Sequence, residues 1–505
     1  MSKSVIRPTP LHRSRVSAAI GASISVLLAA CAVGPNFKKP APPEVGSVAA
    51  KPLSDTASVP NTVAGQSQHF VDGADISADW WALFHSSPLN ELIEQSLTKN
   101  HDLKAAQAAL RVTHENVLAQ RGAFYPSVSA DFSATRQRQS GQISPALNSN
   151  TFLYNLFTPE VNVSFVPDVF GLNRRTVESL QAQEQEARYQ MIATYTTLTS
   201  NVVVTAIQVG AVQMQIAATH DLIDSAENMV KILRYQSDKG YASGLDVAAQ
   251  ESQLAQFAAT LPPLVKQEAQ LRDQLAVLAG RFPSQSPGLN FDLATLELPQ
   301  DLPVSLPSAL VSQRPDVLQA EANLHDASAK IGIATANRLP NIELTANAGS
   351  TAVAMNQLFT TGTGFWGIGA SVTAPLFQGG MLLHQQRAAK AAYEQAAEQY
   401  RSTVLTAFQN VADTLTALQQ DAEAVKAAAH AADAAKVTLD LAQRQWQSGY
   451  AGYLALLSAQ QAYQQGRISL IQAQADRFAD TAALFHALGG GWWHRADLAK
   501  DKHDK

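Results

Sequence analysis

Few residues in this chain have the type and spacing that chemistry requires. The sequence holds one cysteine, Cys31, and twelve histidines without the pairing typical of a metal site. His220, His384 and His430 fall on polar helix positions and are expected at the surface. The sequence contains neither Gly-x-Ser-x-Gly nor a phosphate loop. We therefore predict no catalytic residues, no metal and no cofactor. An enzyme is the alternative class of protein that these observations argue against.

Cys31 ends the one apolar export segment of the chain. The segment opens with four basic residues, Lys3, Arg7, Arg13 and Arg15, and continues as an apolar run over 16–30 that is too short for a permanent membrane helix. Its end, Leu28-Ala29-Ala30-Cys31, resembles the lipobox of bacterial lipoproteins, whose cysteine becomes the first mature residue and carries lipid. We predict a signal peptide over 1–30 and lipid on Cys31; the alternative is a buried structural thiol. Ala32 is not the Asp of an inner-membrane retention signal, which favours the outer membrane.

Composition argues against nucleic acid as a partner and distinguishes the two terminal segments from the rest of the chain. Charged residues make up 16% of the sequence and the formal net charge is −5, which leaves no basic field for nucleic acid. Residues 31–76 are rich in Pro, Ala, Ser and Val without a period, so we expect a lipid-anchored linker or a strap that lies on the body. Residues 494–505 form a charged tail that we expect to be disordered.

Two long helices dominate the sequence. Met381–Ser448 contains no Gly or Pro, and Leu172–Lys239 is interrupted only by Gly210. Apolar residues recur along both at steps of three and four, which keeps one seam facing a partner helix as in a coiled coil. The first seam runs through Leu198, Val202, Ala206, Val209, Ile216, Ile223, Ala226, Val230 and Leu233. The second seam includes Tyr400, Val404, Val411, Leu415, Leu418, Ala422, Val425, Ala429 and Ala432.

The chain is predicted to be a tandem duplication. Gly240-Tyr241-Ala242-Ser243-Gly244-Leu245 corresponds to Gly449-Tyr450-Ala451-Gly452-Tyr453-Leu454 at a shift of 449 − 240 = 209. Asp102-Leu103 corresponds to Asp316-Val317 at a shift of 214. We therefore predict a first repeat over 77–285, a connection over 286–306 and a second repeat over 307–493. Shorter helices are expected over about 88–121, 245–280, 308–337 and 454–488.

Each repeat also carries a pair of alternating segments. Apolar and polar residues alternate around Phe132, Val163, Leu344 and Ile368, within predicted hairpins over about 125–167 and 339–377. Each run is about ten residues long, the length of a transmembrane strand. A single such strand usually belongs to a soluble sheet with one wet face. Four of them in a chain with an export segment favour a membrane sheet, with outer loops over 136–151 and 349–364.

Four strands cannot close a barrel, and an open sheet edge in lipid leaves backbone groups unpaired. The chain must therefore oligomerise. Two copies give eight strands, whose interior is filled by side chains or one small ligand, whereas three copies give twelve, the smallest number here that could leave a channel. The expected fold class is mostly α with a transmembrane β part: a trimeric outer-membrane β-barrel with four strands per chain, continuous with a long periplasmic α-helical barrel. A structural lipoprotein or an adaptor built of helical hairpins is an alternative that needs no such strands.

The sequence resembles the lipoprotein branch of the outer-membrane factor family, which serves tripartite efflux pumps and type I secretion systems. The resemblance covers nearly all of the mature chain, and its residues are Trp80-Trp81, Gln313-Arg314-Pro315-Asp316-Val317 with Glu321, Pro375-Leu376-Phe377-Gln378-Gly379-Gly380, Ala487-Leu488-Gly489-Gly490-Gly491-Trp492 and the segment from Cys31. It implies a homotrimer in outer-membrane lipid, a periplasmic adaptor and an inner-membrane pump, with a proton-driven pump favoured. It implies a passive conduit for drugs or other small molecules; the alternative is the exit duct of a type I protein secretion system.

The turns at the far ends of the two long helices are the predicted docking site for the adaptor. Glycine tolerates a positive φ, and small side chains leave the backbone open to another helix tip. The resemblance implies that the adaptor meets these turns; the alternative is that they are only turns. The residues of this site are Gly240, Tyr241, Ser243, Gly244, Leu245, Gly449, Tyr450, Gly452 and Tyr453.

The resemblance also implies a periplasmic gate just beyond these turns. Trp446 fits the family's aromatic position and Asp246 its acidic gate partner, but Ser458 and Ala455 stand where family members often carry acidic residues. We therefore expect a closed apolar iris formed by Trp446 and Leu454 rather than a cation-binding acidic ring. The alternative for Asp246 is a first-turn acid that stabilises its helix through the dipole.

Overall fold

The structure is a computed structural model of the chain and describes residues 32–48, 52–138, 153–286, 288 and 291–499. The predicted signal peptide and Cys31 lie outside the described residues. The chain forms two compact units. The first comprises the described residues up to Lys39 together with Arg111–Gln185 and Ala322–Glu398, and the second comprises the described parts of Pro40–Leu110, Glu186–Glu321 and Gln399–Lys505.

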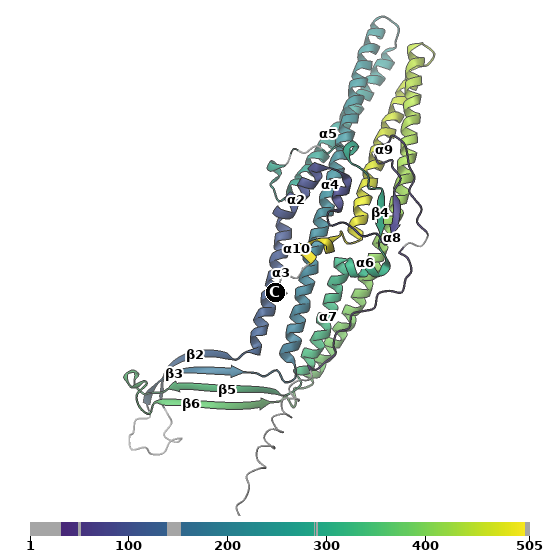
Figure 1. Cartoon of the computed structure of the whole chain (residues 1–505). Helices are drawn as coiled ribbons and strands as arrows, with labels where there is room; N and C mark the ends of the chain where they lie inside the picture. The colour runs from purple at the N-terminus through teal and green to yellow at the C-terminus, as the bar shows by residue number, and fades with distance from the viewer. Residues whose placement is uncertain (1–31, 49–51, 139–152, 287, 289–290, 500–505) are drawn as a thin grey trace, which may run out of the picture. The chain divides into compact units, whose positions relative to one another are not determined.

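The helices come in two sets of four that follow one another along the chain, and Figure 1 colours them by residue number. The first set is α2 (Ser87–Lys99), α3 (His101–Arg121), α4 (Leu172–Asp238) and α5 (Gly244–Leu278). The second set is α6 (Pro307–Gln313), α7 (Pro315–Ala336), α8 (Met381–Gln447) and α9 (Tyr453–Ala487), and a short α10 (Ala496–Ala499) follows. Helices α4 and α8 each have 67 residues, and α5 and α9 each have 35, so the tandem duplication is visible in the structure.

Two predicted helices are each broken into two, which the sequence reading missed. The helix expected over 88–121 breaks at Asn100, whose ψ is 132° and whose side-chain Oδ1 accepts from the Leu103 N–H at 3.0 Å. The helix expected over 308–337 breaks at Arg314, whose ψ is 125°. Pro315 disfavours the helical conformation at the residue before it, so this second break has a local cause.

The predicted apolar seams of the two long helices are confirmed. Val202 and Val209 on α4 and Val411 and Leu418 on α8 are all fully buried. The remaining seam residues are buried or half-buried. Helix α4 is long and apolar enough to cross a membrane, but most of its apolar stretch is buried inside the protein, as in a core helix. Packing between helices therefore accounts for the apolar pattern.

Four strands form one antiparallel sheet in the order β2-β3-β5-β6, visible in Figure 1. They are β2 (Ser127–Arg138), β3 (Leu153–Phe165), β5 (Asn341–Ser350) and β6 (Gly364–Thr373). The two hairpins of the duplication thus join through β3 and β5. A second sheet, which the sequence reading missed, pairs β1 (His69–Asp72) with β4 (Asp301–Val304) in parallel.

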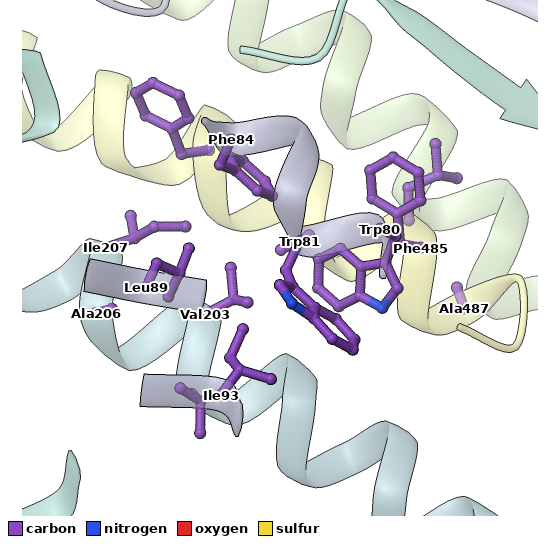
Figure 2. Packing of buried hydrophobic residues seen from close by; sticks show 14 of the residues in the cluster. Trp80, Trp81, Phe84, Leu89, Ile93, Val203, Ala206, Ile207, Phe485 and Ala487 are labelled. Atoms are coloured by element: carbon purple, nitrogen blue, oxygen red, sulfur yellow. The ribbon is translucent and has the colours of Figure 1, made fainter. Parts of the chain in front are cut away.

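The tryptophans that carry the family resemblance lie in the core of the second unit. Figure 2 shows Trp80 against Phe485 of α9; the two rings stack with centroids 5.2 Å apart. Trp492 donates its indole N–H to the Gln313 carbonyl at 2.7 Å. The buried Arg314 donates to the Asp316 carboxylate at 2.6 and 3.0 Å and to the Ala487 carbonyl at 2.8 Å. These landmarks therefore hold the second unit together.

The described part of the N-terminal segment is a strap rather than a free linker. In the second unit, the fully buried Arg477 guanidinium donates to the carbonyls of Ala64 (2.7 Å) and Gln66 (2.8 Å) and to Thr56 Oγ1 (2.8 Å). In the first unit, the buried Arg175 donates to the carbonyls of Val33 (3.0 Å) and Gly34 (3.2 Å) and to Asn36 Oδ1 (2.8 Å).

The expectation of a disordered tail is wrong for residues 494–499. Arg495 forms ion pairs with Asp79 at 3.5 Å and Asp497 at 3.2 Å, and Leu498 is buried. These contacts attach the start of the tail to the second unit; residues 500–505 lie outside the described residues.

Candidate functional site

One turn closes each of the two helical hairpins, α4–α5 and α8–α9 (Figure 1). The two turns have the same backbone hydrogen bonds. At the first tip, the Gly240 N–H donates to Ser237 O at 2.9 Å and the Tyr241 N–H to Gln236 O at 2.8 Å. At the second tip, the Gly449 N–H donates to Trp446 O at 3.0 Å and the Tyr450 N–H to Gln445 O at 2.8 Å. This is the Schellman pattern, in which the glycine takes a left-handed conformation. Gly240 has φ +78° and Gly449 has φ +76°, so both turns need a glycine here.

The two tips differ in how the returning helix is capped. Ser243 Oγ accepts from the Asp246 N–H at 3.2 Å, and the Asp246 carboxylate accepts from the Ser243 N–H at 3.2 Å. This is a capping box, which satisfies two backbone donors at the start of α5. At the second tip, Gly452 is the N-cap of α9 and provides no side-chain acceptor. The alternative interpretation of Asp246 as a first-turn acid is therefore confirmed, and its gate role stays a prediction.

Both tips present apolar and aromatic side chains at their surface. Tyr241 and Tyr450 are 85% and 89% exposed, and Leu245 and Leu454 are also exposed. Tyr453 differs from its predicted placement on the docking surface, because it is only 4% exposed. Its position, one residue after the N-cap, turns the ring toward α8 and into the apolar cluster described next.

A small apolar cluster joins the two hairpins beneath the tips. Its buried members are Met229, Leu233, Ala442, Tyr453, Leu456 and Ala459, and its half-buried members include Ala242, Val247 and Trp446. The Trp446 and Tyr453 rings meet edge to face with centroids 6.2 Å apart. The sequence reading placed Leu233 on a seam but missed Met229 and Leu456, although both continue an apolar helix face.

The Tyr453 hydroxyl is a buried polar group in this cluster. Its oxygen has no hydrogen-bond partner among the described residues. Burial raises the pKa of the Tyr453 hydroxyl, and the negative charge of Asp246 raises it further. The neutral hydroxyl therefore persists, and Asp246 of the first hairpin influences a residue of the second.

The other predicted gate residues have no acidic neighbours on α9. Ser458, Ala455 and Leu454 are all exposed in the single chain. Asp246 is half-buried, and its carboxylate is engaged by Ser243. Within the described ranges, no group of three or more His, Cys, Asp or Glu side chains has the arrangement of a metal site. The structure thus brings Trp446 and Tyr453 together and leaves Leu454 and Ser458 at the surface.

A pair of carboxyl groups links α8 and α9 elsewhere in the second unit. Asp421 lies within hydrogen-bonding reach of Asp480, and burial together with this neighbour raises the pKa of Asp421 to about 7. Asp476 adds negative charge nearby, whereas the cationic Arg477 acts in the opposite direction. Neither acid was singled out in the sequence, because each falls on an ordinary polar helix position.

The four-stranded sheet has one apolar and one polar face. Direct cross-strand partners form the apolar rows Ala130-Val161-Ala348-Trp366 and Val128-Val163-Ala346-Ile368. The alternate rows are Ser129-Asn162-Asn347-Gly367 and Ser127-Ser164-Thr345-Gly369. Successive side chains of a strand point to opposite faces, so the register places each kind of row on its own face. Strands β2 and β6 each have one edge without a partner in the described sheet.

Comparison with known proteins identifies relatives over nearly the whole length of the chain. A family model described as outer membrane efflux protein matches residues 92–281 and 306–490. The two matched segments begin 306 − 92 = 214 residues apart and end 490 − 281 = 209 residues apart, which are the two shifts found in the sequence.

Individual relatives agree with the family model. The probable efflux pump outer membrane protein TtgC of Pseudomonas putida is 30% identical over 502 residues, which cover 97% of this chain and 98% of that protein. The pyoverdine export outer membrane protein OpmQ of Pseudomonas aeruginosa is 28% identical over 477 residues, which cover 93% and 97% of the two chains. The solved open-state structure of the MtrE outer membrane channel of Neisseria gonorrhoeae is similar with a TM-score of 0.76 at 25% identity, covering 92% of this chain and 99% of that chain.

Proposed function

This chain belongs to the outer membrane efflux protein family, and we propose that it is the outer-membrane channel subunit of a tripartite efflux system. The observation that carries the proposal is the two-faced sheet with its two free edges. In lipid an unpaired sheet edge is unfavourable, so β2 of one copy pairs with β6 of the next until the sheet closes. Three copies give twelve strands with the apolar face toward lipid and the polar face toward a water-filled lumen.

The tips are the proposed docking site for a periplasmic adaptor. The exposed Tyr241 and Tyr450 and the repeated turn geometry support this role, since they offer matching apolar surfaces on both hairpins. Aromatic side chains contribute strongly to protein interfaces. An inner-membrane pump, proton-driven by analogy with the lipoprotein branch, would complete the path.

The lipid on Cys31 is proposed as a second attachment to the outer membrane. Support comes from the residues that follow it: the Val33 N–H donates to the Phe170 carbonyl at 3.1 Å, and Arg175 holds the carbonyls of Val33 and Gly34. The first mature residues are thus attached to the loop between β3 and α4. Mass spectrometry of the mature N-terminus tests the modification, and an unmodified Cys31 would refute it.

Small molecules are the favoured cargo. The relatives compared above are named for efflux and for pyoverdine export, which favours small molecules over the protein-secretion alternative. The apolar contact between Trp446 and Tyr453 supports a resting state closed by apolar side chains. The exported compound itself depends on the pump.

Two measurements test the proposed function together. The purified protein should run as a trimer in native mass spectrometry, and it should conduct ions in a planar bilayer. A strain that lacks the chain should become susceptible to drugs, and the wild-type chain should restore resistance. A stable monomer that passes no current would overturn the proposal.

A further inference from the structure

Charge is sorted between the two faces of the four-stranded sheet. The strands hold five charged residues: Asp131, Arg136 and Arg138 on β2, Glu160 on β3 and Glu343 on β5. Asp131 pairs directly with Glu160, and Glu343 with Ser371, so all three acids lie in the polar rows. The continuous register of β2 pairs Arg136 with Asn155 and Arg138 with Leu153, in line with the apolar rows. Both basic residues therefore lie on the apolar face.

The two arginines have no partner among the described residues. Their side chains are exposed, and neither forms an ion pair or a side-chain hydrogen bond within the described residues. Between Arg138 and Glu160 the sequence contains no charged residue, and none occurs between Glu343 and Arg387. The two hairpin loops, between β2 and β3 and between β5 and β6, therefore offer no carboxylate to either arginine.

The position of the pair on the strand indicates what it meets. The apolar run on β2 ends at Ala134, and Arg136 and Arg138 follow on the same face about 7 Å apart, two strand residues. A cation on the lipid face is unfavourable in the hydrocarbon but tolerated near the membrane surface. Arginine can also extend its charged head from an apolar surface toward water. With the apolar face in lipid, as the proposed function has it, the pair would lie where hydrocarbon gives way to lipid headgroups.

We propose that Arg136 and Arg138 form a binding site for phosphate groups of outer-membrane lipids, at the end of the barrel farther from the helices. This inference rests on the proposed function, which places the apolar face in lipid. A guanidinium donates two parallel hydrogen bonds to a phosphate, which makes arginine suited to this ligand. Three copies carry 3 × 2 = 6 arginines, so lipid phosphates would surround the barrel at this level.

A different role for the pair is protection of the β2 edge, because charged side chains deter unwanted strand pairing. That role needs positive charge but no particular ligand and no particular face. The chain offers a variant that separates the two roles. Gln137 lies between the arginines and on the polar face, paired with Tyr154. Arg136→Gln combined with Gln137→Arg therefore moves one charge to the other face and keeps the composition unchanged.

The test is lipid binding to the detergent-solubilised full-length protein, followed by native mass spectrometry. The probes are dioleoyl phosphatidic acid, dioleoyl phosphatidylcholine and dioleoylglycerol, which share acyl chains and differ in headgroup. The wild type should bind phosphatidic acid most tightly, and Arg136→Gln/Arg138→Gln should weaken that binding by at least about tenfold. Arg136→Lys/Arg138→Lys should retain most of it, and millimolar inorganic phosphate should compete only in proteins with the pair. The face-swapped variant should bind like Arg136→Gln alone.

Three results would overturn the inference: equal binding of phosphatidic acid and dioleoylglycerol by the wild type, unchanged affinity in the double glutamine variant, or wild-type affinity in the face-swapped variant. The first needs no variant and stands even where a substitution impairs folding. Channel current measured on the same preparations separates the proposals. A conducting wild type without phosphate discrimination refutes only the lipid site, whereas a protein that forms no channel refutes the proposed function.

Discussion

Ser243 and Asp246 cap one another: the serine hydroxyl accepts from the Asp246 N–H at 3.2 Å and donates to the Asp246 carboxylate at 2.8 Å. The same carboxylate accepts from the Ser243 N–H at 3.2 Å. The equivalent residues of the second tip, Gly452 and Ala455, cannot form these side-chain bonds. The duplicated turns have therefore diverged in local stability while keeping the same backbone path.

Substitution at the capping box should distinguish capping from gating. Ser243→Ala removes the side-chain acceptor but keeps the Asp246 charge, and it should destabilise the start of α5 by about 1 kcal/mol. Asp246→Ala removes both the carboxylate of the capping box and the proposed gate partner. If Asp246 also acts as a gate partner, only Asp246→Ala should raise the resting current in a planar bilayer, while both should speed amide exchange at residues 243–247. Equal resting currents in the two variants would show that Asp246 caps the helix and has no gate role.

The apolar contact beneath the tips should restrict the resting channel. Trp446→Ala combined with Leu454→Ala should raise the resting current, because the substitutions remove a half-buried and an exposed apolar side chain from the predicted iris. Gln443→Ala is the matched control, since Gln443 is an exposed residue of α8 outside the predicted gate. An unchanged current in the Trp446/Leu454 variant would contradict the iris.

A bulky charge at the second tip should abolish adaptor docking without disturbing the turn. Gly452 has φ −71°, and a Cβ there would meet no atom within 4 Å, so Gly452→Arg introduces no strain. It should abolish efflux in a drug-susceptibility assay and cross-linking to the adaptor, while trimer formation stays at the wild-type level. Gly46→Arg is the control, because Gly46 is equally unobstructed and lies outside the tips. Full efflux by Gly452→Arg would show that the tip is only a turn.

Patterns that repeat along the sequence predicted much of the fold. The seams of α4 and α8 and the alternation of the four strands arise from burial on one side, which leaves a period of 3.5 or 2 in the sequence. The tips were visible for a similar reason, because a left-handed residue at a helix end requires glycine in both copies. Features that follow from local steric rules or from burial on one side can thus be predicted from the sequence of a segment alone.

Features that depend on distant backbone were not predictable. Arg477 looks like an ordinary polar residue of α9, and only the carbonyls of Ala64 and Gln66 from the strap explain its burial. The short β1–β4 sheet likewise pairs residues more than two hundred positions apart. Tyr453 was expected at the surface because it lies in a tip, yet α8 supplies a ring for it to contact. Each miss requires knowledge of which segments become neighbours.

An acidic residue on the apolar face of the sheet should impair insertion. Phe132→Asp or Ile368→Asp places a carboxylate on a face where both wild-type side chains are exposed in the single chain, and in lipid this costs roughly 1–3 kcal/mol, depending on depth. The amount of trimer in isolated outer membranes should fall. Ser133→Asp, one residue along β2 and on the polar face, should leave it unchanged. Equal loss in both kinds of variant would contradict the assignment of the faces.

The Asp421–Asp480 pair should make the protein less stable as the pH rises. The pKa of Asp421 is about 7 in the folded chain, above its ordinary value of 3.8, so the folded state holds the proton more tightly than the unfolded state. The stability contributed by this group is fully present below about pH 4 and is lost as the pH rises through 7. Burial of the Asp421 carboxyl is the main cause of this raised pKa, the hydrogen bond and negative charge of Asp480 and the charge of Asp476 add to it, and Arg477 offsets it only in part. The midpoint of thermal unfolding should therefore decrease between about pH 5 and about pH 8.

Asp421→Asn, whose amide can donate to Asp480 without titrating, should flatten this dependence of the unfolding midpoint on pH. Asp413→Asn, at an exposed position of α8, should not. Parallel curves for the wild type and Asp421→Asn would show that the carboxyl pair holds no shared proton.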